Sequence, residues 1–147
     1  MIVVDTNVFV YAANSAAPEH PRCRSLVETW RAGPEPWGTT WGVFYEFLRV
    51  VTHSRVLSRP LTAAQAWSFV EAVLASPSFR VLGETDRHAA FAARTIAEIP
   101  LLAGNVLHDV HTAAVMREHG VRRVCTRDTD FHRFPFLEVV DPMEAPA

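Results

Sequence analysis

Short apolar runs alternate with longer segments of helical spacing along this chain, and this alternation constrains its fold more than any other feature. It is the pattern of an α/β domain with a mostly parallel central sheet, because parallel strands need a crossover helix between them. We expect strands at residues 1–4, 37–40, 79–82, 121–126 and 136–140. We expect helices at residues 6–14, about 21–31, 41–53, 61–75, 85–99 and 106–119.

Length and composition indicate a globular chain with no membrane segment. The 147 residues match one ordinary domain, and we predict a single domain over residues 1–147. The formal net charge of −2 gives no global basic signal for nucleic acid, and two cysteines make neither a disulfide framework nor a zinc cluster. Polar residues break the first apolar run, which is therefore neither a signal peptide nor a membrane span. We expect a cytoplasmic protein, with the last residues, 141–147, frayed.

Asp5 directly follows the first expected strand. In an open parallel sheet, ligands bind outside the carboxyl ends of the strands, so an acid at this position is a candidate ligand-binding residue. The structural alternative is that Asp5 caps the helix that starts at Thr6, a frequent role of Asp. The position alone does not decide between the two.

Four further acids stand at positions that invite the same question. Glu46 lies in an expected helix that is apolar on nearly every side, where it could instead pair with Arg49. Asp109 lies in the first turns of another helix, where the helix dipole favours an acid. Asp128 and Asp130 follow a late strand, where turns often contain Asp.

Taken together, these acids indicate a metal site. Carboxylates that converge repel one another, and a cluster of them is stabilised when divalent cations neutralise it. Oxygen-only ligands favour Mg²⁺ or Mn²⁺. No nucleophile elbow, reactive cysteine or glycine-rich phosphate loop is present in the sequence. The predicted reaction is therefore hydrolysis of a phosphodiester or phosphomonoester by a water molecule that the metal activates.

The motifs "VVDTN", "HDVHTAAVMREHGV" and "TRDTDFHRFPFLEVVDP", with an acid in an apolar helix between the first and the second, resemble the PIN-domain ribonucleases. Within these, the chain is similar to VapC-type toxins of type II toxin–antitoxin pairs. The resemblance covers essentially the whole chain and implies a PIN-like three-layer α/β/α domain with a short, mostly parallel sheet. It implies that the acidic quartet, which is both catalytic and metal-binding, consists of Asp5, Glu46, Asp109 and Asp128. Asp130 matches an accessory acid that helps to hold metal.

The resemblance also implies supporting residues and partners. Asn7 and Thr126 match polar residues that orient the acids through hydrogen bonds. The family cleaves RNA with Mg²⁺ or Mn²⁺, usually forms homodimers, and is inhibited by a cognate antitoxin protein. Arg127 and Arg133 are candidate RNA contacts, and residues 37–51 and 61–74 suggest a hydrophobic groove for the antitoxin.

Two families of phosphohydrolases share single features with this sequence but lack others. A haloacid-dehalogenase phosphatase needs a second Asp at the position of Asn7 and a downstream Lys, and all 14 basic residues here are Arg. An HD-type phosphohydrolase would use His108 and Asp109 but leaves Asp5 unexplained. His108 and His111 share a helix face that could hold zinc, but no third ligand stands at a recognisable spacing. A PIN-fold module that binds RNA or protein without catalysis is the alternative function.

Overall fold

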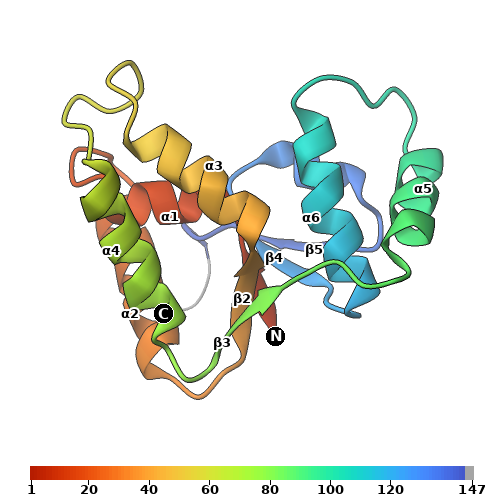
Figure 1. Cartoon of the computed structure of the whole chain (residues 1–147), viewed down its shortest axis with the longest axis horizontal. Helices are drawn as coiled ribbons and strands as arrows, with labels where there is room; N and C mark the ends of the chain where they lie inside the picture. Colours follow the sequence, from red (N-terminus) through yellow and green to blue (C-terminus); the bar gives the residue numbers. More distant parts are fainter. Residues whose placement is uncertain (145–147) are drawn as a thin grey trace.

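The computed structural model of the chain describes residues 1–144. Its centre is a five-stranded sheet in the order β3-β2-β1-β4-β5, in which all neighbouring strands are parallel (Figure 1). The strands are β1 (Ile2–Val4), β2 (Trp37–Thr40), β3 (Phe79–Leu82), β4 (Arg123–Cys125) and β5 (Glu138–Val140). The expected α/β class and the mostly parallel sheet are therefore confirmed.

Helices cover both faces of the sheet and give the expected three layers. They are α1 (Thr6–Ala13), α2 (His20–Ala32), α3 (Trp41–Val51), α4 (Ala63–Leu74), α5 (His88–Glu98) and α6 (Val106–Glu118), with a 3-10 helix, η1 (Thr129–Arg133). Consecutive residues of β1 point to opposite faces: Ile2 and Val4 pack with α1 to α4, and Val3 packs with α6 and η1. Figure 1 shows α1, α2 and α4 on one side of the sheet, with α5 and α6 on the other.

Some element boundaries differ from the expected ones for identifiable reasons. Helix α5 begins at His88 and not at residue 85, because Thr85 forms a turn in which its hydroxyl accepts a hydrogen bond from Arg87 N and its carbonyl accepts one from His88 N. Helix α4 begins after Thr62, as a capping box with Gln65 requires.

The parallel arrangement brings the ends of β1 and β4 together. Register pairs Val4 with Cys125, and the amide of Asp5 donates a hydrogen bond to the carbonyl of Cys125 at 3.1 Å. The residues that follow these two strands, Asp5 and Thr126, therefore lie side by side although 121 positions separate them. This edge of the sheet is where the sequence predicts a binding site.

The expectation of a frayed C-terminal segment is wrong for residues 141–144. Arg22 Nε donates to the carbonyl of Pro142 at 3.0 Å, and Met143 N donates to Asp141 Oδ1 at 2.8 Å, so this segment is a turn held against α2. Residues 145–147 of the expected tail lie outside the described residues. Among residues 1–144, no helix combines the length and the apolar character needed to cross a membrane.

Candidate active site

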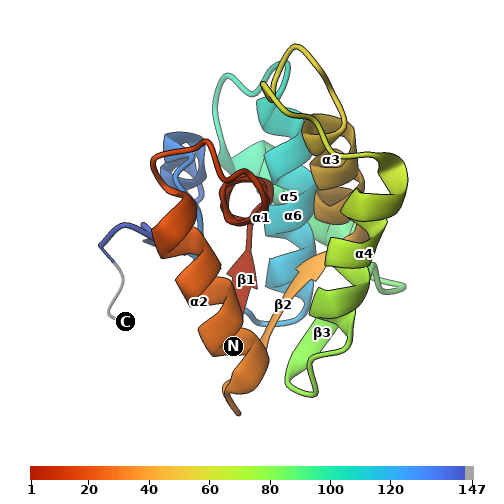
Figure 2. The same ribbon diagram turned by 90° about the vertical axis from the view of Figure 1, so that its left-hand side faces the viewer.

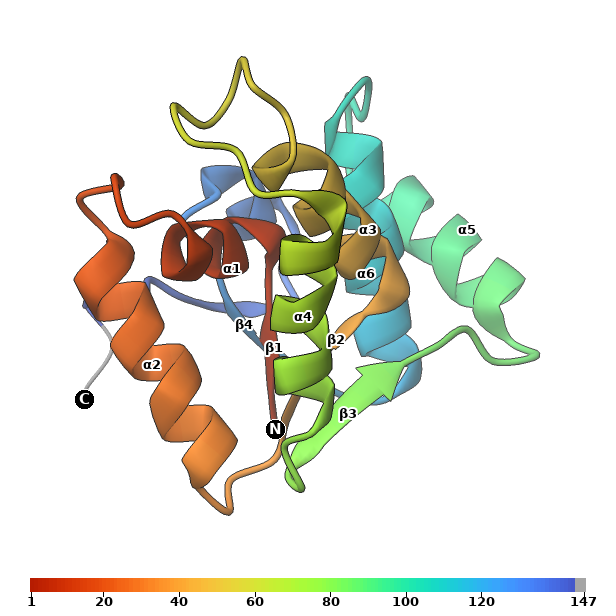
Figure 3. The same cartoon turned by 60° about the vertical axis from the view of Figure 1, so that its left-hand side comes forward.

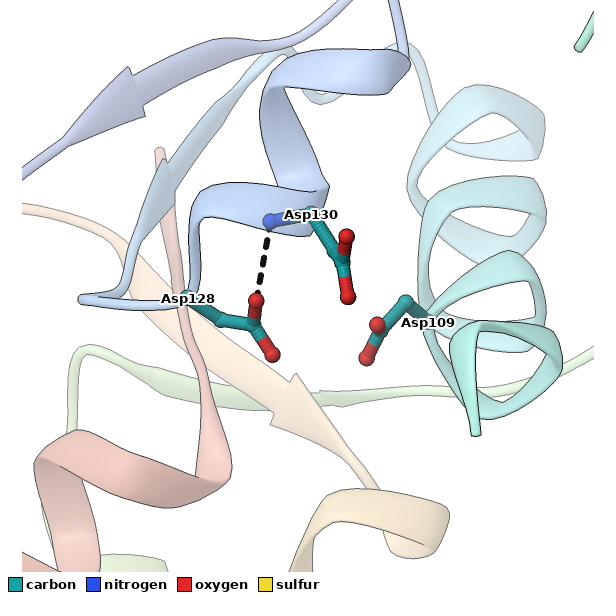
Figure 4. A group of neighbouring side chains, drawn as sticks. All are labelled: Asp109, Asp128 and Asp130. Carbon is teal, nitrogen blue, oxygen red and sulfur yellow. Dashed lines mark hydrogen bonds between the residues drawn. The ribbon is translucent and has the colours of Figure 1, made fainter. Parts of the chain in front are cut away.

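Three aspartates converge at the carboxyl edge of the sheet. Asp109 lies in the first turn of α6 and Asp130 in η1, and Asp128 is the residue that caps η1. One carboxylate oxygen of each lies within 4.8 Å of those of the other two, and Figure 4 shows the three side chains pointing toward a common point. Asp128 Oδ1 accepts a hydrogen bond from Asp130 N at 2.8 Å, which holds the two acids of the turn in place.

The surroundings of Asp109 disfavour its charge. Burial raises the pKa of this carboxyl to about 7, and the negative charges of Asp5, Asp128 and Asp130 contribute to the same shift. Near neutral pH and without a bound cation, Asp109 is therefore a mixture of the protonated and ionised forms. A divalent cation at the centre of the cluster would replace that proton and relieve the repulsion.

Asp5 fills the capping role that its position in the sequence left open, and its role as a metal ligand stays a prediction. Its Oδ1 accepts a hydrogen bond from Thr6 N at 2.7 Å, and this contact caps α1. Its Oδ2 accepts from Asn7 Nδ2 at 2.8 Å and from Thr126 Oγ1 at 2.6 Å. Burial raises the pKa of Asp5, these three hydrogen bonds oppose the rise, and the charge of Asp128 adds to it. Asp5 is thus a helix cap that lies within the electrostatic field of the aspartate cluster.

Asn7 and Thr126 join Asp5 to the turn after β4. Asn7 Nδ2 also donates to Thr126 Oγ1 at 2.8 Å, and Asn7 Oδ1 accepts from Arg127 N at 3.1 Å. Thr126 Oγ1 accepts from Asp128 N at 2.9 Å. These bonds fix Asp128 relative to Asp5, and they are the contacts that an orienting role requires.

The structure does not bring Glu46 into this cluster. Its carboxylate pairs with Arg49 through contacts of 2.9 and 2.5 Å, as the alternative for this residue proposed, and this hydrogen bonding lowers its pKa. The apolar residues of α3 do not enclose Glu46 as the sequence suggested: one side of the helix faces solvent, since Tyr45 is 67% exposed and the Glu46 side chain 42% exposed. The charge of His108 on α6 lowers the pKa of Glu46 further, so Glu46 faces the helix that carries Asp109.

Arg127 and Arg133 both have partners within the chain. Arg127 Nη1 donates to Glu19 Oε1 at 2.7 Å and its Nε lies 3.7 Å from Asp141 Oδ1, which ties the turn after β4 to α2 and to the end of β5. Arg133 Nη2 donates to the carbonyls of residues 100 and 101 between α5 and α6. Their contact with RNA stays a prediction, and it would require these bonds to be shared or exchanged.

Figure 2 shows α2 and α4 on either side of α1, which is seen end-on. Residues of these three helices and of the segments beside them line a hollow of about 360 Å³, away from the aspartates. Its lining combines apolar side chains with charged ones: Ala12, Ala13, Ser15, His20, Arg24, Val27, Glu28, Leu61, Gln65 and Phe69. Of the two segments expected to form a groove, residues 61–74 contribute to this lining and residues 37–51 do not. Sequence patterns missed the contribution of α2, because a groove between three helices depends on how they pack.

Comparison with known proteins assigns the family. The family model described as "PIN domain" matches residues 2–137, which span every residue of the site described above. The chain belongs to the PIN domain family. Its curated relatives include ribonuclease VapC48 of Mycobacterium tuberculosis, 34% identical over 94% of each chain. Ribonuclease VapC43 of the same organism is 35% identical over 98% of this chain and 97% of its own. The chain is thus similar to VapC ribonucleases over nearly its whole length.

Solved structures agree on the fold. VapBC2 from Rickettsia felis, bound to a DNA fragment from its promoter, contains a chain that matches with a TM-score of 0.68 at 19% identity, over 95% of this chain and 98% of that one. VapC20 of Mycobacterium tuberculosis, described as a Sarcin-Ricin loop cleaving toxin, matches with a TM-score of 0.65 at 22% identity, over 90% of this chain and 93% of that one. At such identities the likeness shows the PIN fold that the sequence resembled.

Proposed function

We propose that the protein is a metal-dependent endoribonuclease, the toxin of a toxin–antitoxin pair, in which residues 1–147 form one PIN-like domain. The observation that carries the proposal is the convergence of Asp109, Asp128 and Asp130 at the carboxyl edge of the sheet, next to Asp5. Membership of the PIN domain family and close similarity to curated ribonucleases support RNA as the substrate.

The residues of the cluster suit Mg²⁺ or Mn²⁺. Asp109, Asp128 and Asp130 offer hard oxygen donors and no soft donor atom, and Asp5 adds negative charge beside them. When bound, the cation would activate a water molecule and neutralise charge on the phosphate while that water attacks the phosphorus. The chain itself holds the acids in place: Asn7 and Thr126 keep Asp5 and Asp128 oriented.

The first test is RNA cleavage in vitro. Single-stranded RNA is the substrate to use, since its backbone can enter a cleft without unpairing. We expect cleavage with millimolar Mg²⁺ or Mn²⁺ and none in excess EDTA, because without a cation the clustered acids repel the RNA phosphate and nothing neutralises the charge that develops on it during hydrolysis. Restoring Mn²⁺ after chelation should restore cleavage. Full activity in EDTA would contradict the proposed mechanism.

The second test concerns the antitoxin partner. The chain is similar to components of solved toxin–antitoxin complexes, among them one from Klebsiella pneumoniae. A ribonuclease without an inhibitor would harm its host, so expression of the chain alone should arrest bacterial growth. A short neighbouring gene that encodes a DNA-binding antitoxin should relieve the arrest on co-expression. Normal growth in the presence of soluble, metal-binding protein would favour the alternative, a PIN-fold RNA- or protein-binding module without catalysis.

Exposed aromatic side chains support the proposed homodimer. Trp41 and Trp67 stack on each other with ring centroids 6.4 Å apart and remain 43% and 39% exposed, and Tyr45 lies beside Trp41. Aromatic residues are enriched in protein interfaces, where their large faces are buried.

We also propose that Glu46 joins the metal site by exchanging Arg49 for the cation. Arg49→Ala removes the competing partner, so the affinity for Mn²⁺ should rise roughly two- to fivefold, the range that an exposed ion pair can contribute. Titration of Mn²⁺ by electron paramagnetic resonance measures the affinity directly. Arg55→Ala, at an exposed arginine just after α3, is the matched control and should change nothing. An unchanged affinity in Arg49→Ala would leave Glu46 outside the metal site.

A further inference from the structure

A loop that contains two unpaired arginines joins α3 to α4. Residues 47–70 contain three arginines and no acid, although the formal net charge of the chain is −2. Two of the three, Arg55 and Arg59, lie in residues 52–60, which we call the arginine loop. Both residues are exposed, and neither side chain has a hydrogen bond, ion pair or ring contact within residues 1–144. Their charges are therefore available to a negatively charged ligand.

Contacts with the rest of the fold hold the arginine loop in place. Leu61 N donates a hydrogen bond to the carbonyl of Val51 at 2.9 Å, which brings the two ends of the loop together. Within the loop, Leu57 N donates to the carbonyl of His53 at 3.2 Å. The Leu57 side chain is only 3% exposed and packs in the core beside α1 to α4. A loop fixed in this way needs little further ordering when it binds a ligand.

An exposed side of α3 leads from the aspartate cluster to the arginine loop. Gly42, Glu46 and Arg49 lie on this side at spacings of four and three residues. A Cβ on Gly42 would lie 3.3 Å from His111 Nδ1, so this side faces α6, the helix that carries Asp109. The last residue of α3 lies roughly 8 Å beyond Glu46 along the helix axis, and the arginine loop begins there. Figures 1 and 3 show this loop and the first turn of α6 at the same end of the molecule.

We propose that the arginine loop binds the phosphate backbone of single-stranded RNA at a position that flanks the cut, and that the strand reaches the loop along the exposed side of α3. The inference rests on the proposed function and extends it to nucleotides that lie outside the aspartate cluster. Arg55 and Arg59 supply positive charge to the phosphates. The exposed hydroxyls of Ser54 and Ser58, which have no partner among the described residues, supply hydrogen bonds. Such contacts hold an RNA strand without reading its bases.

Electrostatics favours RNA as the ligand over a segment of a protein partner. Acids gather where the cut would take place and repel an approaching strand, and positive charge away from them offsets this repulsion. When Glu46 exchanges Arg49 for the cation, Arg49 adds a further charge on the same path. A protein partner binds chiefly through large aromatic side chains, and residues 52–60 contain no Phe, Tyr or Trp. The sequence indicated Arg127 and Arg133 as RNA contacts instead, and both of these have partners within the chain.

The test measures the binding of fluorescently labelled, single-stranded oligouridine by anisotropy, in Mg²⁺ and over a range of salt concentrations. Every protein carries Asp128→Asn, so that the RNA stays intact. Arg55→Ala and Arg59→Ala should each lower the affinity about fivefold at about 0.1 M salt and reduce the slope of log affinity against log salt by about 0.7. Arg55→Lys keeps the charge and should retain the slope.

Arg122→Ala is the matched control for these substitutions. Arg122 is also exposed, and its side chain has no partner in the part of the chain that the structure describes. It directly precedes β4, whereas Asp128 follows that strand, so Arg122 lies at the opposite edge of the sheet. Its loss should leave the salt slope unchanged.

Cleavage assays on the protein with Asp128 intact separate this inference from the proposed function. Arg55→Ala and Arg59→Ala should raise KM for RNA and leave both kcat and the affinity for Mn²⁺ close to those of wild type, because the loop lies away from the reacting atoms. Metal-dependent cleavage in which neither substitution changes KM or the salt slope would overturn the inference and leave the proposed function in place. Binding that depends on both arginines, in a protein that cuts no RNA, would support the inference and contradict the proposed function. Unchanged RNA binding with weaker inhibition by a co-expressed antitoxin would assign the loop to the protein partner and overturn the inference.

Discussion

Replacing Asp109 by Asn is expected to abolish RNA cleavage and, in the absence of metal, to make the protein more stable than wild type at pH 8. The amide keeps the size of the side chain but removes one charge from the cluster. Loss of a negatively charged ligand should lower the cleavage rate about a thousandfold or more, since a metal ion contributes several kcal/mol to the stabilisation of such a transition state. Asp109 has no hydrogen bond to another described side chain that the amide would break.

The expected gain in stability depends on pH in a defined direction. The pKa of Asp109 is raised to about 7 in the folded protein, from its ordinary value of 3.8. Between these values the unfolded chain has already released the proton that the folded chain retains, so wild type loses stability as the pH rises through this window. Asn does not titrate. Its advantage in the free energy of unfolding should be about 1–2 kcal/mol at pH 8, after allowance for partial solvent screening, and should shrink toward pH 4.

Urea melts of both proteins in EDTA, from pH 4 to pH 8, measure this difference. Glu35→Gln, the same type of neutralisation at an exposed acid far along the chain, should follow wild type at every pH. Asp109 is better suited to this measurement than Asp5, because an amide at position 5 provides one acceptor where Thr6, Asn7 and Thr126 donate three hydrogen bonds. An Asp109→Asn variant less stable than wild type at pH 8 would show that Asp109 is stabilising and not repelled.

The second large effect is expected at Asp128. Asp128→Asn should lower the rate of RNA cleavage at least about a hundredfold, and Asp130→Asn only about tenfold. The charge of Asp128 raises the pKa of both Asp5 and Asp109, whereas the charge of Asp130 raises the pKa of Asp109 but not that of Asp5. Asp128 is therefore the more central of the two proposed ligands. Thermal melts should show that Mn²⁺ stabilises Asp130→Asn more than it stabilises Asp128→Asn.

The fold of the Asp128 variant should remain intact. Asn can accept the hydrogen bond from Asp130 N that caps η1, because Asn and Asp are comparable caps. A melting temperature in EDTA that is not lower than that of wild type would therefore assign the loss of activity to the missing charge. If Asp130→Asn lost more activity than Asp128→Asn, the order of the ligands in this turn would be the reverse of the one proposed.

The sequence predicted the parts of this protein that local patterns determine. The strand at residues 79–82 and the helix capped by Thr62 needed only hydrophobic spacing and capping chemistry. Parallel strands place their carboxyl ends at one edge, and Asp5 therefore lies beside the turn that carries Asp128; that both acids bind metal stays a prediction.

Tertiary contacts decided what the sequence could not. The pairing of Glu46 with Arg49 was one of two open readings, and only the exposure of that face of α3 distinguishes them. The contact of His88 with Glu118 joins residues 30 positions apart, and no pattern in the sequence predicts it. The same holds for Arg127, whose partners are Glu19, directly before α2, and Asp141, directly after β5.

The position of β1 in the middle of the sheet also has a consequence for synthesis in the cell. Asp5 leaves the ribosome 121 residues before Thr126, which completes its surroundings together with Asp128. Until β4 has been made and has paired with β1, one side of β1 is open and the acids cannot gather. A nascent chain that has not yet reached β4 therefore lacks the assembled cluster, and the proposed ability to cut RNA would arise only after β4 has been synthesised.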